Sequence, residues 1–164
     1  MILSLPPKIP DLGYFVISLK LPEEIEKSVI DRHWLALDQA IQIETQRGGI
    51  IFEELYKVLQ FTQIEFIISI RSSLEIPDED GIWHDDGSRK LAFSLSLTLN
   101  PGEIKGGILE IRRRDQQSSF CPSHALPTPT FGTMIVFATG IYGFEHKINK
   151  VSQGERIIIA GWCT

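Results

Sequence analysis

Residues 91–99 read LAFSLSLTL, and this stretch alternates almost strictly between large apolar and small side chains. Leucine and phenylalanine occupy the odd positions, whereas alanine, serine and finally Thr98 occupy the even ones. Because successive side chains of an extended strand point to opposite faces, this pattern predicts a β-strand with one face in an apolar core. The other face carries small hydroxyl groups. They would suit a polar co-substrate if they line a cavity, and they would have no such meaning in bulk water.

Upstream of this strand the hydrophobic period changes near Thr62. Before it, apolar residues recur every three or four positions, which predicts helices. One helix is expected to begin at Pro22, and a second is expected over about residues 52–60. The stripe that the first helix buries consists of Ile25, Val29, His33, Leu37 and Ile41, with His33 at the edge of the core.

Beyond Thr62 the period approaches two, and a series of short strands is expected. A first strand at residues 11–20 precedes the helices, and the later strands are placed at residues 64–71, 91–99, 134–137, 144–151 and 156–162. Helices followed by many short strands predict a mainly β fold with N-terminal helices, a double-stranded β-helix or jelly roll. A chain of 164 residues fits a single domain 1–164, with helical support at about 22–61 and the jelly-roll core at about 62–164.

Composition excludes several classes of protein. The net charge of -5 argues against a general binder of phosphate backbones, so nucleic acid is not an expected partner. No apolar run reaches the roughly 20 residues that span a bilayer, and the N-terminus has no secretory pattern. Cys121 and Cys163 are too few for a disulfide framework, which predicts free thiols in the cytoplasm. Nothing in the sequence indicates an oligomeric state.

A polar cluster, His84-Asp85-Asp86, lies shortly before the alternating strand. On an extended backbone His84 and Asp86 share a face, while Asp85 points the other way. His146 belongs to a later predicted strand and can complete a set of two imidazoles and one carboxylate. This is the facial triad of non-haem iron(II) oxygenases, which leaves coordination positions open for substrate and O2. We therefore take His84, Asp86 and His146 as candidate metal ligands and catalytic residues.

Arg156 is the candidate anion-binding residue. Its planar guanidinium fits a carboxylate with two parallel hydrogen bonds, which lysine cannot reproduce. Arg156, Ile158 and Trp162 share one parity and therefore one strand face, which would make an anion pocket with an apolar wall. Taken alone, Arg156 is more simply read as a solvated residue beside the turn at 152–155. Its combination with the triad favours the pocket.

Further segments follow the triplet in a characteristic order: Leu99-Asn100, Gly106-Gly107-Ile108-Leu109-Glu110, Pro129 to Phe137 before His146, and Gly154-Glu155-Arg156 before Trp162. Together they resemble the iron(II)- and 2-oxoglutarate-dependent dioxygenase superfamily, closest to its prolyl-4-hydroxylase-like branch. The resemblance covers roughly the C-terminal two thirds of the chain.

The resemblance implies cofactors and roles. Fe(II) would bind to His84, Asp86 and His146, and Arg156 would hold the distal carboxylate of 2-oxoglutarate. Thr98 and Trp162 are further co-substrate candidates, although Thr98 stands where family members commonly have a co-substrate-binding tyrosine. With O2, and with ascorbate as a possible addition, the implied reaction converts 2-oxoglutarate to succinate and CO2 while a C–H bond of a peptide or small-molecule substrate is hydroxylated.

Two alternatives stay open at this stage. One is a jelly-roll binding or sensing module that keeps the metal cavity without oxidation. The other is a cupin-type metalloenzyme without 2-oxoglutarate, in which Arg156 would be structural. Succinate production from 2-oxoglutarate separates them from the oxygenase.

Substrate recognition is expected from residues 77–83, from a long loop at 116–130, or from the helical N-terminus. The basic run Arg112-Arg113-Arg114 is interpreted as a solvated strand end, with the rim of an anionic substrate site as the alternative.

Overall fold

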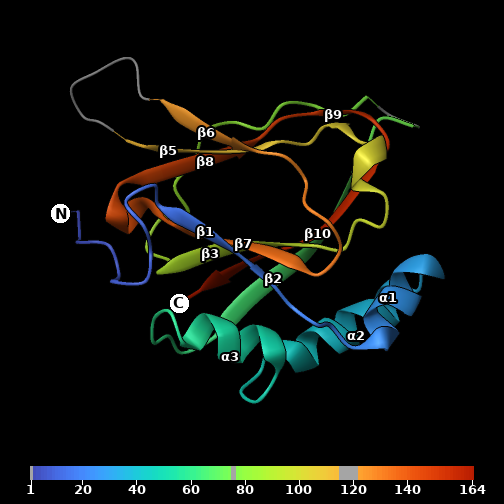
Figure 1. The fold of residues 1–164 in the computed structure, drawn as a ribbon, viewed down its shortest axis with the longest axis horizontal. Coiled ribbons are helices and arrows are strands. Elements are labelled where there is room, and N and C mark those ends of the chain that lie inside the picture. Colours follow the sequence, from blue (N-terminus) through green and yellow to red (C-terminus); the bar gives the residue numbers. More distant parts are fainter. Residues whose placement is uncertain (1, 75–76, 115–121) are drawn as a thin grey trace.

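The computed structural model describes residues 2–74, 77–114 and 122–164 (Figure 1). It contains the helices α1 (Glu23–Ile30), α2 (Trp34–Glu44) and α3 (Ile50–Tyr56) and the short 3-10 helices η1 (Pro101–Glu103) and η2 (Gly140–Tyr142). The strands are β1 (Tyr14–Ser18), β2 (Ile64–Ser72), β3 (Leu91–Ser96), β4 (Lys105–Gly106), β5 (Leu109–Arg113), β6 (Ser123–Leu126), β7 (Thr133–Ala138), β8 (Phe144–Ile148), β9 (Val151–Gln153) and β10 (Glu155–Cys163). In the described part of the chain, no helix is long and apolar enough to cross a membrane.

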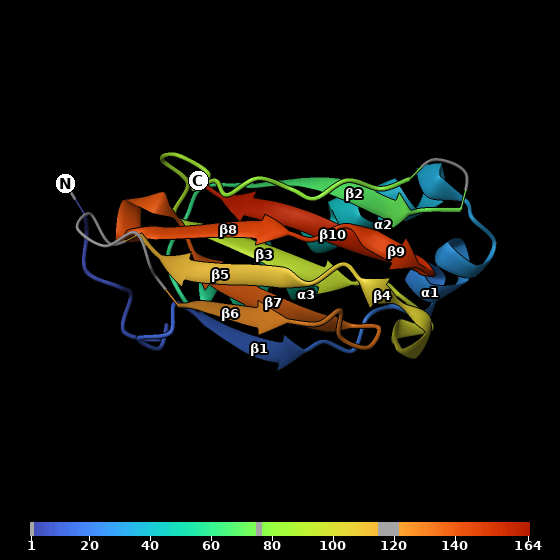
Figure 2. The same ribbon diagram turned by 90° about the horizontal axis from the view of Figure 1, so that it is seen from above.

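The strands form two facing layers. The larger sheet has the order β1-β7-β3-β10-β2, and the smaller one has the order β6-β5-β8, with the pair β4-β9 beside it. All the pairings are antiparallel. Figure 2 shows the smaller sheet in front of the larger one. This is the double-sheet jelly roll predicted from the change of period, and the strands dominate the chain after residue 62.

The helices cover the outer face of the larger sheet (Figure 1). Their buried residues, among them Ile25, Leu37 and Leu55, belong to the same hydrophobic cluster as the strands. Every residue of β3 and β7 is buried, because one face of the sheet packs on the helices and the other faces the smaller sheet. The hydroxyl row of residues 91–99 therefore faces the interior and not bulk water, which resolves the alternative left open by the sequence.

The first predicted helix is in fact two helices. The chain breaks at Arg32, whose φ of 53° is in the left-handed region, and the N–H of His33 donates to the carbonyl of Ser28. His33 is consequently exposed and not at the edge of the core, which corrects the stripe expected from its spacing. A four-residue period cannot reveal one left-handed residue, because the pattern resumes after it.

Other boundaries also differ from expectation, and the strand expected at 91–99 ends at Ser96. Part of the predicted loop at 116–130 forms strand β6, which pairs with β5, while residues 116–121 lie outside the described residues. The single strand expected at 144–151 is divided into β8 and β9, which pair with different partners. Cys163 is buried and free, as predicted; Cys121 lies outside the described residues.

Candidate metal and co-substrate site

Three ligand side chains meet between the sheets. One ligand atom from each of His84, Asp86 and His146 lies within 4.8 Å of the others. Nε2 of His84 is 3.7 Å from Oδ1 of Asp86, and Nε2 of His146 is 3.7 Å from Oδ2 of the same carboxylate. The side chains of Asp86 and His146 are buried, whereas that of His84 is 49% exposed. The cluster is thus open to solvent on the side of His84.

Backbone pairing positions the two histidines. His84 and His146 form an isolated antiparallel bridge, in which each N–H donates to the carbonyl of the other at 3.0 and 2.9 Å. Nδ1 of His84 lies 2.9 Å from the carbonyl oxygen of Ile82. If Nδ1 donates to this carbonyl, Nε2 carries the free lone pair and faces the carboxylate, which is the tautomer that a metal ligand requires.

Asp86 reaches the site from a tight turn. Its φ of 59° is in the left-handed region, which aspartate tolerates better than most residues, and Gly87 follows at 65°. The extended backbone expected for residues 84–86 is therefore absent at Asp86, and Asp85 stabilises the turn instead. Its carboxylate accepts from the N–H of Gly87 at 3.0 Å and from Nη1 of Arg114 at 2.9 Å. The ligand turn is therefore fixed to the end of β5.

Burial sets the protonation of the ligands. The pKa of His146 is lowered to about 3, first by burial and then by the nearby His84, so its imidazole is neutral. Burial raises the pKa of the Asp86 carboxyl, against a hydrogen bond from the Trp162 side chain and the attraction of His84 and Arg89. Among the residues that the structure describes, Oδ2 of Asp86 is buried and has no hydrogen-bond partner. A bound cation would satisfy this oxygen and favour the ionised carboxylate, so the three residues fit a divalent metal.

Arg156 lies on β10 and is 2% exposed. Its Nε donates to the hydroxyl of Thr128 at 3.1 Å, and that hydroxyl donates to the carbonyl of Gly107 at 3.3 Å. Nη1 of Arg156 is buried and has no hydrogen-bond partner in the described part of the chain. The pKa of Arg156 is lowered to about 10, first by burial and then by the charge of Arg71. A buried guanidinium without a contacting carboxylate fits an anion-binding role.

A cavity of about 60 Å³ lies between the two sheets beside His146. Its lining includes Ser94 of the hydroxyl row, Ile158 and Trp162. Ile158 and Trp162 stand on the same strand face as Arg156, as their parity predicted. Trp162 thus forms a wall of the cavity and also lowers the pKa of Asp86.

Thr98 is buried at the end of β3 and bonds to the backbone of β10. Its hydroxyl donates to the carbonyl of Ile157 and accepts from the N–H of the same residue, both at 3.0 Å. Thr98 therefore attaches the end of β3 to the residue that follows Arg156.

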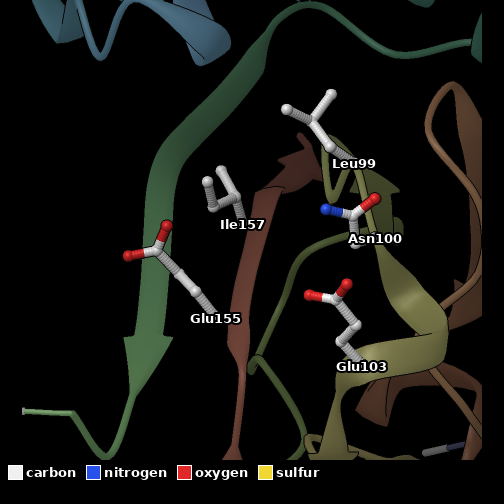
Figure 3. A pocket seen from close by; sticks show the side chains of 5 residues that line it. All are labelled: Leu99, Asn100, Glu103, Glu155 and Ile157. Atoms are coloured by element: carbon white, nitrogen blue, oxygen red, sulfur yellow. The ribbon is translucent and has the colours of Figure 1, made fainter.

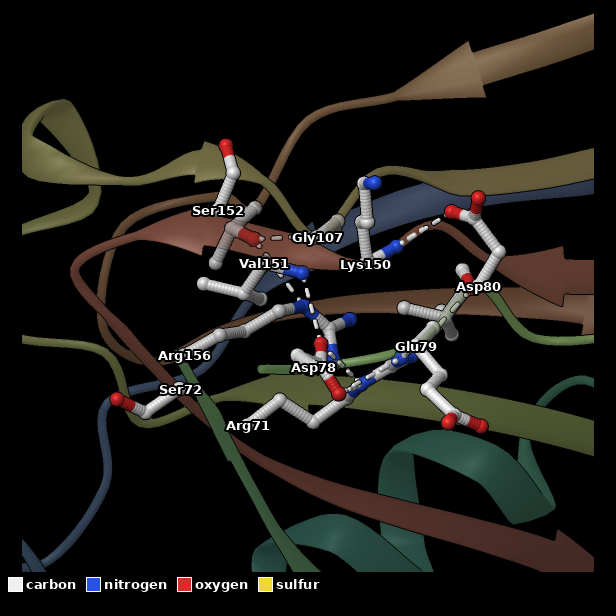
Figure 4. Close-up of polar contacts among 12 residues, drawn as sticks. Arg71, Ser72, Asp78, Glu79, Asp80, Gly107, Lys150, Val151, Ser152 and Arg156 are labelled. Carbon is white, nitrogen blue, oxygen red and sulfur yellow. Dashed lines mark hydrogen bonds and ion pairs between the residues drawn. The ribbon is translucent and has the colours of Figure 1, made fainter. Parts of the chain in front are cut away.

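Sequence reasoning missed Thr128, although it directly precedes the segment that begins at Pro129. It also missed Arg71 and Asp78, which form an ion pair near Arg156 and are shown in Figure 4. No local pattern marks these residues, because they meet Arg156 only through strand pairing and loop closure.

The three arginines of the basic run at 112–114 contact neighbouring side chains of the same domain. Arg112 pairs with Glu145 at 2.8 Å and stacks over the ring of Trp83, while Arg114 pairs with Asp85. Arg113 lies over the ring of Phe144. These contacts hold the segment before His84 against the smaller sheet, and they give no support to an anionic substrate rim.

A second cavity, of about 150 Å³, is lined by Leu99, Asn100, Glu103, Glu155 and Ile157 (Figure 3). It contains none of the three metal-ligand candidates. The carboxylate of Glu155 accepts two hydrogen bonds from Arg32, at 2.9 and 3.0 Å. This pocket is acidic and is not a place for a carboxylate co-substrate.

A sequence model of the 2OG-Fe(II) oxygenase superfamily matches residues 77–164, which is more than half of the chain and includes His84, Asp86, His146 and Arg156. The chain belongs to the 2OG-Fe(II) oxygenase superfamily. As a member, it is a 2-oxoglutarate- and iron(II)-dependent oxygenase, and this favours the oxygenase over the binding module and the cupin-type enzyme.

Solved structures agree on the fold of this 2OG-Fe(II) oxygenase. A prolyl-4-hydroxylase from Pseudomonas putida is similar with a TM-score of 0.61 at 16% identity, over 97% of this chain and 95% of that one. A prolyl 4-hydroxylase from Phytophthora capsici gives a TM-score of 0.63 at 13% identity, over 96% of this chain and 60% of that one. The epimerase SnoN from nogalamycin biosynthesis gives a TM-score of 0.61 at 10% identity, over 93% of this chain and 77% of that one. The search of curated proteins found no match.

Proposed function

We propose that His84, Asp86 and His146 bind Fe(II), that Arg156 binds the distal carboxylate of 2-oxoglutarate, and that the enzyme hydroxylates a C–H bond of a peptidyl or small-molecule substrate. One observation carries the residue assignment. Among the described residues, the buried side-chain polar atoms without a partner are Oδ2 of Asp86 and Nη1 of Arg156. One is an acceptor suited to a cation, and the other is a donor suited to an anion.

Each residue of the site has a task that its contacts support. His84 presents Nε2 because Nδ1 faces the carbonyl of Ile82. His146 is kept neutral by burial, so no proton must leave before it can bind a metal. The Trp162 side chain favours the ionised form of the third ligand, because it lowers the pKa of Asp86 against the effect of burial. When bound, Fe(II) and 2-oxoglutarate supply the chemistry that activates O2 and oxidises the substrate.

Arg156 orients the co-substrate. Its Nε is fixed by Thr128, which leaves the outer edge of the guanidinium for a carboxylate. The lining of the cavity, with Ile158 and Trp162, keeps bulk water away from the space beside His146. A charge-assisted hydrogen bond formed there is stronger than one in solvent.

The substrate is proposed to approach on the exposed side of His84. Similarity to two prolyl 4-hydroxylases supports a peptidyl proline as the first candidate. Because the epimerase SnoN has the same TM-score as the bacterial prolyl-4-hydroxylase, a small-molecule substrate is the second. A cytoplasmic location and a stimulation by ascorbate are also proposed, the former on the free thiol of Cys163.

The decisive experiment measures succinate formed from 2-oxoglutarate by purified protein with Fe(II) and O2, across proline-containing peptides, free amino acids and other small molecules. We expect iron-dependent succinate that increases with the correct substrate. His146→Ala should abolish it, whereas His33→Ala, which removes an exposed histidine, should not. Absence of succinate for every substrate, and also without substrate, would contradict the proposed activity.

A further inference from the structure

The larger sheet places two arginines side by side. Arg71 on β2 is the direct cross-strand partner of Arg156 on β10. Partners in an antiparallel ladder point to the same face, and like charges directly opposite destabilise the pair. The charge of Arg71 accordingly contributes to the lowered pKa of Arg156. The pair requires an anion to be stable.

Asp78 supplies that anion, and it is bound to Arg71. Nε of Arg71 donates to Oδ2 at 3.0 Å, and Nη2 donates to Oδ1 at 3.2 Å. The N–H of Val151 also donates to Oδ2, at 2.7 Å. The remaining donors of Arg71 reach the backbone carbonyls of Ile148 and Glu79. Figure 4 shows the side chains of Arg71, Asp78 and Arg156 converging. Each of the three side-chain nitrogens of Arg71 thus donates a hydrogen bond.

Arg156 lies close enough to Asp78 for the charge of the carboxylate to affect its pKa, but the two side chains are not paired. The carboxylate of Asp78 raises the pKa of Arg156, yet the hydrogen bond recorded for Arg156 goes to Thr128. Two guanidinium groups and one carboxylate leave one unbalanced positive charge at this place. The unbalanced charge corresponds to one carboxylate, which is what the tail of 2-oxoglutarate offers.

We propose that Arg71 is a positioning residue that holds the carboxylate of Asp78 and thereby keeps Arg156 free for the carboxylate of 2-oxoglutarate. Without Arg71, Asp78 would keep the backbone N–H groups of Val151 and Glu79 as donors, next to a buried guanidinium that needs an anion. The two would pair, because a buried charge is stable only with a counter-ion. An internal ligand would then compete with the co-substrate. This inference rests on the proposed role of Arg156.

The test is a calorimetric titration of 2-oxoglutarate into Mn(II)-loaded protein, for the wild type, R71Q, D78N and the double variant R71Q/D78N. R71Q should raise the dissociation constant roughly ten- to hundredfold, the range expected when a charge-assisted hydrogen bond is lost to a competitor. D78N removes that competitor, so the double variant should return to within about threefold of the wild type. Mn(II) affinity should stay constant throughout. R47Q, which removes an exposed guanidinium, is the matched control.

Rescue separates competition from a purely structural role. If R71Q binds like the wild type, or if it binds weakly and D78N does not restore it, the inference is wrong. Should R71Q fail to fold, R71K and the double variant still decide. R71K keeps one donor for Asp78 and should bind 2-oxoglutarate more weakly than the wild type, whereas the double variant should stay within about threefold of the wild type. A double variant as weak as R71K would overturn the inference. A wild type without saturable 2-oxoglutarate binding would instead refute the role of Arg156, and this inference with it.

Discussion

At the scale of single residues, the proposed contact between the guanidinium of Arg156 and 2-oxoglutarate would distinguish this oxygenase from a general metal-binding jelly roll. Arg156→Lys keeps the charge but loses the planar fork that binds a carboxylate twice. We expect a loss of about 1.5–3 kcal/mol in 2-oxoglutarate binding, or roughly one to two decades in the dissociation constant. Titration of the Mn(II)-loaded protein measures it, with unchanged Mn(II) affinity as the control. Equal affinities would mean that Arg156 is not the anchor.

Gly107 is required where the chain passes Arg156. Its φ is 64°, and a Cβ at this position would lie 2.7 Å from Cδ of Arg156. Gly107→Ala should therefore cost about 1–3 kcal/mol of stability from backbone strain. It should also displace Arg156 and weaken 2-oxoglutarate binding without changing metal affinity.

Gly102 offers a matched control for this substitution. Nothing lies within 4 Å of a Cβ built there. Gly102→Ala should leave both the melting temperature and 2-oxoglutarate binding near the wild-type values. If Gly107→Ala behaves like Gly102→Ala in both assays, the close approach to Arg156 has no functional consequence.

At the scale of elements, the turn that carries Asp86 depends on its attachment to β5. Asp85→Ala removes the pair with Arg114 and the hydrogen bond from Gly87. The three candidate ligand side chains are unchanged, but the turn that orients Asp86 is no longer fixed. We therefore expect Mn(II) affinity to fall about ten- to hundredfold, the usual effect of removing a residue that orients a metal ligand. Asp11→Ala, at an exposed position, should bind Mn(II) normally. Equal affinity for both variants would show that Arg114 does not support the turn.

The attachment of residues 77–83 to β2 and β9 should depend on pH. Burial alone would raise the pKa of Asp78, but hydrogen bonds from Val151 and Arg71, together with the charge of Arg71, outweigh it and lower the pKa from 3.8. A lowered folded-state pKa means that the unfolded chain binds the proton more tightly. The stabilisation is therefore present above pH 3.8 and is lost as pH falls through the folded-state pKa.

Urea unfolding of the wild type and of D78N measures this dependence. The difference in free energy of unfolding between them should be largest near neutral pH and should shrink below pH 3.8. A difference that stays constant over this range would show that Asp78 acts by shape and not by charge.

At the scale of the whole molecule, the helices stabilise a sheet whose opposite face carries the site. Leu37 on α2 is fully buried, whereas Leu35 on the same helix is 74% exposed. Leu37→Ala should lower the free energy of unfolding by about 2–5 kcal/mol, and Leu35→Ala should change it little. Urea unfolding compares the two. Below its unfolding transition, Leu37→Ala should still bind Mn(II) normally, and a lost metal site in the folded variant would contradict this separation of roles.

The sequence by itself determined those features that a local pattern records. The alternation at residues 91–99 established a strand with a hydroxyl face, and the change of period near Thr62 predicted helices before a β-rich core. The His84-x-Asp86 spacing marked two candidate ligands, but the extended backbone assumed for them was wrong, because Asp86 lies in a turn with a φ of 59°. The even spacing between Arg156 and Trp162 was enough to place both side chains on one face of their strand.

Only the tertiary structure decided which distant residues meet. The register of β2 on β10 sets Arg71 opposite Arg156, and the chain after β2 brings Asp78 to Arg71. Thr128 reaches Arg156 from the connection between β6 and β7. Arg71 and Thr128 lie far from Arg156 in the chain, and a shift of one residue in the register of β2 on β10 would turn Arg71 to the other face. Local periodicity carries no information about register, so the surroundings of Arg156 could be found only in the folded protein.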